Sequence, residues 1–148
     1  MRPLGWVYNV LQQPFIALFL FVGLIYFWLW SSIHFDAMLS RDLYWVMNWS
    51  MLLDGLLFWW LIFDPRPPAI TSSLGYGRRM LVLAAAGVLQ MFLGAWIVFS
   101  RDMVYDVYEV CGRAWPLDPE VDQLLGGMLT YIPPAMMSIL GILLMLRR

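Results

Sequence analysis

A small set of side chains in this sequence has the types and spacing that metal chemistry needs. Met47 and Met51 are one helical turn apart, so in a helix their thioethers would share one face. Thioether sulfur suits Cu(I), for which two or three soft ligands suffice. The candidate copper ligands are Met47, Met51, Met128, His34 and Met103. The alternative is that the methionines are flexible apolar packing in a helix bundle.

A second set consists of polar side chains inside apolar stretches, namely Asp54, Asn48 and Gln90. A carboxylate at the bilayer centre costs about 2.5–3.5 kcal/mol on insertion scales, so we expect Asp54 to face protein. We expect it near Gln90, which lies at a similar depth, or near the last apolar helix. Such groups could form an ion or proton path or surround a metal. The alternative is hydrogen bonding between helices.

Composition excludes several classes of protein. The chain is 62% hydrophobic and 13% charged, whereas soluble domains are about 45–50% apolar and about 25% charged. His34 is the only histidine and Cys111 the only cysteine, which excludes within one chain a bis-histidine haem, a three-histidine zinc site and a disulfide. Without a nucleophile–base pair or phosphate loop, we do not predict an enzyme. The net charge of −1 and the absence of a basic patch argue against nucleic acid.

Four apolar stretches are long enough to cross a hydrocarbon core of about 30 Å as helices. They are residues 14–33, 43–63, 80–100 and 124–146, and the longest connection, 101–123, is acidic. The small residues at 84–87 would let another backbone approach the third helix closely. The sequence therefore predicts one all-α integral membrane domain over residues 1–148, a bundle of four transmembrane helices.

Arginine placement predicts the orientation of this bundle, since the sequence contains no lysine. The two termini and the second connection share one side, which carries Arg2, Arg66, Arg78, Arg79, Arg147 and Arg148. By the positive-inside rule this side is cytoplasmic, so both termini are cytoplasmic. His34, Cys111 and the acidic connection then lie outside, and the candidate methionines lie in or near the outer half.

Two segments carry a resemblance to a known family. Residues 35–39 (FDAML) and then 55–60 (GLLFWW) are similar to the "YDAAL … GLLFWW" segment of the CtaG family of bacterial cytochrome c oxidase assembly factors. Residues 122–133 (DQLLGGMLTYIP) are similar to that family's "DQxLGGLIMWxPG", with the acid–amide pair, paired glycines and proline at the same spacing. The chain resembles the C-terminal part of these proteins, which usually have about seven spans.

The resemblance implies a multi-pass protein of the bacterial cytoplasmic membrane, in contact with lipid and with cytochrome oxidase subunits. It also implies a link to the oxidase copper centre and hence copper as a possible cargo. Three family histidines are replaced here by Trp30, Tyr44 and Asn48. Any metal-binding role of those histidines therefore cannot be assigned to the residues at these positions. One alternative is a structural accessory subunit of a respiratory or other membrane complex, without bound metal. A third is a small transporter or channel. The sequence leaves a homo-oligomer open.

Overall fold

The computed structural model describes residues 10–64, 75–105, 110 and 116–147, and within these ranges the chain is helical, without strands. Helices are expected here because a bilayer offers no water to backbone amides and carbonyls, which a helix satisfies internally. The all-α prediction is confirmed. The described helices are α2 (Pro14–Trp28), α3 (Ser31–Leu39), α4 (Arg41–Phe63), α5 (Tyr76–Phe99) and α7 (Pro119–Leu146).

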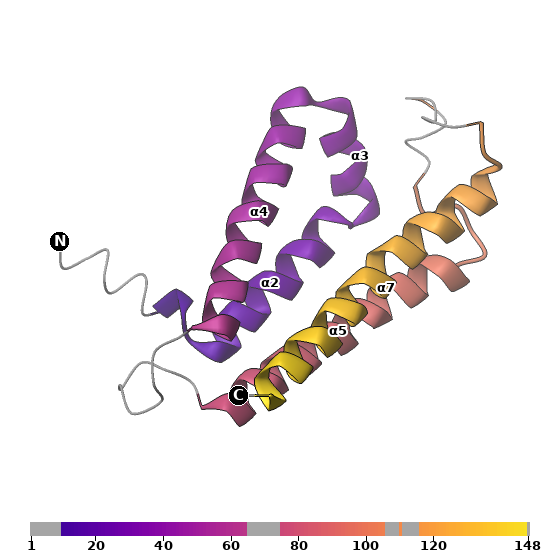
Figure 1. Cartoon of the computed structure of the whole chain (residues 1–148). Helices are drawn as coiled ribbons and strands as arrows, with labels where there is room; N and C mark the ends of the chain where they lie inside the picture. The colour runs from indigo at the N-terminus through magenta and orange to yellow at the C-terminus, as the bar shows by residue number, and fades with distance from the viewer. Residues whose placement is uncertain (1–9, 65–74, 106–109, 111–115, 148) are drawn as a thin grey trace.

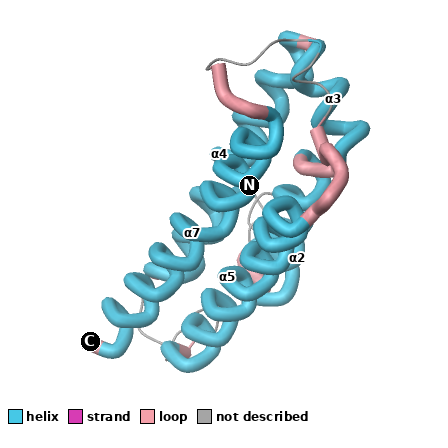
Figure 2. Tube along the Cα trace, turned by 90° about the vertical axis from the view of Figure 1, so that its right-hand side faces the viewer, coloured by secondary structure: helices cyan, strands magenta, loops and turns pink. Residues whose placement is uncertain are grey.

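The helices form two antiparallel units, shown in Figure 1. In one unit α2 and α3 lead back into α4, and in the other α5 pairs with α7. Because α2 contacts both α4 and α5, it lies between α4 and the α5–α7 pair. Figure 2, turned by 90°, again shows α5 and α7 running beside each other. We call the end of the bundle that carries Arg78, Arg79 and Arg147 the arginine end, and the opposite end the junction end.

The first apolar stretch is not the single helix that the sequence predicts over residues 14–33. It is divided into α2 and α3, whose axes differ by 70°. The separating residues Leu29 and Trp30 leave the helical conformation, with Trp30 extended at φ −64° and ψ 126°. No proline or glycine lies at this break. It is instead stabilised by hydrogen bonds from the side chains of His34 and Tyr105.

α4, α5 and α7 all begin earlier than predicted, and in α4 and α7 a capping side chain sets the start. α4 begins at Arg41, after Ser40, whose hydroxyl accepts from the Leu43 amide. α7 begins at Pro119, after Asp118, whose carboxylate accepts from the Glu120 amide. The expected polar connection between the first two spans is therefore mostly helix α3.

The α5–α7 interface is built on glycines that bring the two backbones into contact. A Cβ on Gly94 would lie 2.6 Å from the Tyr131 Cβ and 3.0 Å from the Gly127 carbonyl oxygen. A Cβ on Gly127 would lie 2.6 Å from the Val98 Cγ2 and 3.2 Å from the Gly94 carbonyl oxygen. Toward the arginine end, Gly87 faces Ser138 in the same way. Small residues are the usual means of close helix packing in membranes, where lipid is as apolar as leucine.

The largest core cluster lies toward the arginine end and joins both units. Phe58 and Ile62 of α4 and Leu83 of α5 are almost fully buried there. Phe21 of α2 stacks on Phe58 with ring centroids 4.1 Å apart. At this end Arg79, only 3% exposed, donates to the carbonyl oxygens of Ile62 and Asp64 at the end of α4.

Three described helices, α4, α5 and α7, are each long and apolar enough to cross a membrane. The pair α2 and α3 passes the same test only when taken together, so the number of spans is three, or four if the bent pair is one span. The start of α2 and the end of α7 both lie at the arginine end (Figure 1).

Candidate functional site

The break between α2 and α3 exposes backbone carbonyls, and two side chains satisfy them. The His34 Nδ1 lies 3.2 Å from the Trp28 carbonyl oxygen. A carbonyl only accepts, so His34 is the Nδ1–H donor in this contact. The Tyr105 hydroxyl donates to the Leu29 carbonyl oxygen over 2.9 Å. Each bond replaces a helical partner that the break removes.

These residues also connect the two helical units. Ser31 at the start of α3 donates to the Val104 carbonyl oxygen over 2.6 Å. The rings of His34 and Tyr105 meet edge to face with centroids 4.9 Å apart. We call the contacts of Leu29, Ser31 and His34 with Val104 and Tyr105 the junction. Through these contacts the α2–α3 bend packs against the segment that follows α5.

Gln123 in the first turns of α7 holds the other side of that segment. Its Oε1 accepts from the Val104 amide over 2.8 Å. Its Nε2 donates to the carbonyl oxygens of Ile97 and Asp102 at 3.4 and 3.3 Å. One side-chain amide thus orders the turn after α5 and attaches it to α7. The acid–amide–glycine motif of residues 122–127 therefore has a structural purpose.

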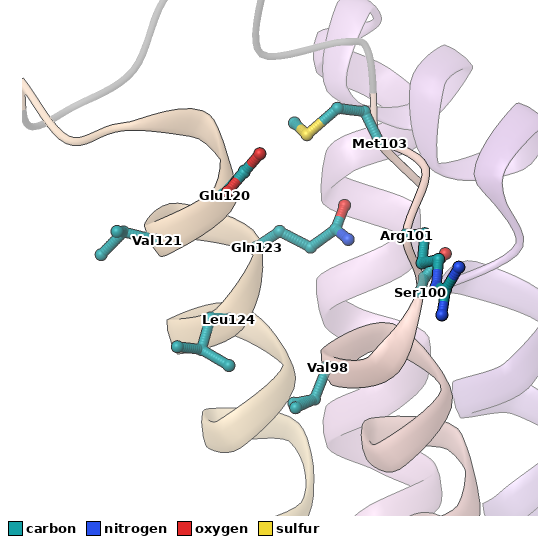
Figure 3. A pocket seen from close by; sticks show the side chains of 8 residues that line it. All are labelled: Val98, Ser100, Arg101, Met103, Glu120, Val121, Gln123 and Leu124. Atoms are coloured by element: carbon teal, nitrogen blue, oxygen red, sulfur yellow. The ribbon is translucent and has the colours of Figure 1, made fainter.

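A groove of about 420 Å³ lies beside Gln123, between the end of α5 and the start of α7 (Figure 3). Val98, Val121 and Leu124 supply apolar walls, and Met103 lines the groove from the segment after α5. Ser100, Arg101, Glu120 and Gln123 supply its polar atoms. Met103 is one of the candidate copper ligands predicted from the sequence, whereas no sequence pattern indicates the groove itself.

The candidate copper ligands on α4 have different surroundings. Met47 is 8% exposed and packs in a cluster with Trp28 and Ala37, against which Met38 also lies. Met51, one turn along, is 36% exposed. The two thioethers are therefore not equally accessible to one ion.

Met128 lies on α7, which the structure does not bring beside Met47. α4 and α7 approach each other at the arginine end, where the Trp59 ring lies 3.7 Å from the position that a Cβ on Gly141 would take. Toward the junction end the two helices diverge (Figure 1). Among the described residues, no three His, Cys, Asp or Glu side chains form a group that could hold a metal ion.

The intramembrane polar residues differ in burial, and no described hydrogen bond joins one to another. Asn48 is exposed and donates to the Tyr44 carbonyl oxygen of its own helix over 2.8 Å. Gln90 is 4% exposed on α5, and Asp54 is partly buried on α4. Among the described residues no hydrogen bond joins Asp54 to Gln90. The hydrogen bond from the Tyr26 hydroxyl to the Leu89 carbonyl oxygen, 2.6 Å long, links α2 to α5 near Gln90.

Removing the Tyr105 hydroxyl should weaken the junction. We expect Tyr105→Phe to lower the free energy of unfolding by about 1–3 kcal/mol, because the Leu29 carbonyl loses its side-chain donor. Tyr44→Phe is the matched control, since Tyr44 is exposed and its hydroxyl bonds to no described residue. Tryptophan fluorescence during thermal unfolding in detergent measures both variants. Equal melting temperatures for the two would contradict this role of Tyr105.

Comparison with protein-family models places these features in context. The model of the cytochrome c oxidase caa3 assembly factor family (Caa3_CtaG) matches residues 3–148. The match covers essentially the whole chain and extends beyond the two motifs that carried the resemblance. Comparison with curated proteins and with solved structures found no match. On the family match, the chain belongs to the cytochrome c oxidase caa3 assembly factor family.

Proposed function

We propose that this protein is a helical scaffold in the bacterial cytoplasmic membrane that binds subunits of a cytochrome c oxidase during assembly. The family match supports the oxidase as the partner. The scaffold role rests on the structural contacts made by residues of the 122–127 motif. Gln123 orders the turn after α5, and Gly127 lets α7 contact α5. Both residues fix the arrangement of the helices, and family membership likewise suggests a non-catalytic role.

Affinity purification tests this proposal against the accessory-subunit alternative. The tagged chain, extracted from native membranes of growing cells, should co-purify oxidase subunits. The mature oxidase purified through one of its own subunits should lack the chain, and deletion of the gene should lower oxidase activity. Stoichiometric presence of the chain in the mature enzyme would instead establish an accessory subunit. Absence of oxidase subunits from the first preparation, with normal oxidase activity after deletion, would reject the oxidase as the partner.

Copper handling would be a more specific role within this function, and it is tested by measuring Cu(I) binding. If Cu(I) binds at the ligands on α4, a Met47→Leu, Met51→Leu double variant must bind it more weakly than the wild type. We expect equal binding, because Met47 is part of an apolar cluster and Met51 lies at the surface. Competition with a chromogenic Cu(I) chelator measures this. Weaker binding by the double variant would establish copper at these residues.

The orientation belongs to the same proposal, with both termini cytoplasmic. It follows from four spans, the bent α2–α3 pair counting as one, and from the arginines at the arginine end. The single cysteine, Cys111, provides the test. A membrane-impermeant maleimide applied to intact spheroplasts should label the wild type. It should fail to label a Cys111→Ser, Ser73→Cys variant until the membrane is permeabilised. The reverse pattern would invert the topology.

A further inference from the structure

The groove at the junction end contains two opposite charges that do not pair. Arg101 follows α5 and Glu120 lies in the first turn of α7, and both line the groove. Both side chains are exposed, and neither forms an ion pair or hydrogen bond with any described residue. The amide of Gln123, between them, is already occupied by Val104, Ile97 and Asp102. The groove therefore offers one cation and one anion to a ligand.

The rest of the groove is apolar and lies where two membrane helices end. Val98 on the last turn of α5 and Leu124 on α7 line it on the side toward the membrane-spanning segments. Phe99, beside Val98, is 82% exposed, as expected of a side chain that faces lipid. The groove volume of about 420 Å³ falls within the range of roughly 300–1,000 Å³ that is typical of small-ligand sites.

We propose that this groove binds one phospholipid with a zwitterionic headgroup that carries a primary amine, that is, a phosphatidylethanolamine. The phosphate binds Arg101, and the ammonium donates to the Glu120 carboxylate. The start of an acyl chain lies along Val98 and Leu124. Charge-assisted hydrogen bonds of these two kinds are stronger than neutral ones. This inference does not depend on the identity of the oxidase partner.

The charges around the groove select among headgroups. Asp102 and Asp118 are exposed and lie close in sequence to the two groove charges, so the surroundings are acidic and disfavour an anionic phosphatidylglycerol, which has no cation to offset the repulsion. Phosphatidylcholine is zwitterionic, but its trimethylammonium group has no N–H to donate to Glu120. Only the primary amine satisfies both sides of the groove.

Native mass spectrometry of the full chain in mild detergent tests the proposal. The protein is mixed with dioleoyl phosphatidylethanolamine, phosphatidylcholine or phosphatidylglycerol, which share their acyl chains. We expect one phosphatidylethanolamine to be retained about tenfold better than either of the others, as one charge-assisted hydrogen bond allows. Soluble phosphoethanolamine in excess should not displace it, since it lacks the acyl chain. Equal retention of the three lipids, or displacement by phosphoethanolamine, would overturn the proposal.

Two variants assign the preference to the groove. Glu120→Gln should remove the preference for phosphatidylethanolamine over phosphatidylcholine, and Arg101→Gln should lower retention of both. The matched controls are Asp42→Asn and Arg78→Gln, which change exposed charges in the first turns of α4 and α5. Melting temperatures show whether each variant is folded. Arg101→Lys, which keeps the charge, should retain most binding if Arg101→Gln unfolds. An unchanged preference in folded Glu120→Gln would contradict the site.

Discussion

Gly127→Ala is expected to lower the free energy of unfolding by about 1–3 kcal/mol, the usual cost of overpacking a close contact. The added methyl group would meet the Val98 Cγ2 at 2.6 Å, the Val98 amide nitrogen at 3.1 Å and the Gly94 carbonyl oxygen at 3.2 Å. A side chain can rotate away, but two of these atoms belong to backbone. The two helices must therefore separate, which loosens contacts along the whole α5–α7 interface.

The neighbouring glycine gives the control for this experiment. A Cβ on Gly126 would meet nothing within 4 Å. Gly126→Ala should therefore leave stability unchanged or raise it by roughly 0.5–1 kcal/mol, since glycine is unfavourable inside a helix. Thermal unfolding in detergent, followed by tryptophan fluorescence, compares the two variants directly. If Gly126→Ala and Gly127→Ala lose stability equally, the paired glycines do not act through this interface. Gly127→Leu should lose more than Gly127→Ala.

Arg79→Met is the second variant with a large expected effect, a loss of about 2–4 kcal/mol in the free energy of unfolding. Arg79 is 3% exposed, and its guanidinium donates to the carbonyl oxygens of Ile62 at 3.4 Å and Asp64 at 2.5 Å. The last carbonyls of a helix lack helical donors, and a cation there is favoured by the helix dipole. Methionine keeps most of the apolar contact but removes the donors, and hydrogen bonds to charged groups contribute about 1.5–3 kcal/mol each.

The adjacent arginine separates this local effect from the general charge of the arginine end. Arg78→Gln removes one exposed positive charge and should change stability by less than about 0.5 kcal/mol. Arg79→Lys should lie between wild type and Arg79→Met, because an ammonium keeps the charge but not the planar fork. The same unfolding assay measures all three variants. Equal melting temperatures for Arg78→Gln and Arg79→Met would show that the buried contacts do not stabilise the end of α4.

The sequence alone determined the helical class and the helices α4, α5 and α7. A long apolar segment in a bilayer must satisfy its backbone hydrogen bonds within itself, as a helix does. The length and composition of each segment are therefore enough to predict a helix. The small-residue stretch at 84–87 also correctly indicated close packing of the third helix, since Gly87 contacts Ser138. The resemblance in residues 35–60 and 122–133 was sufficient to identify the family, and the match over residues 3–148 confirms it.

Only the tertiary structure decided how the first span is divided and what the junction residues do. No proline or glycine marks the break after Trp28 in the sequence. The break is stabilised instead by His34 and Tyr105, whose side chains bond to the carbonyl oxygens of Trp28 and Leu29. Tyr105 lies far from Leu29 in sequence, so periodicity contains no signal of their contact. Likewise, Gly126 and Gly127 are identical residues side by side, and only the rotation of α7 against α5 decides that Gly127 is the contact. Helix formation depends on neighbours along the chain, whereas these contacts depend on how separate helices pack.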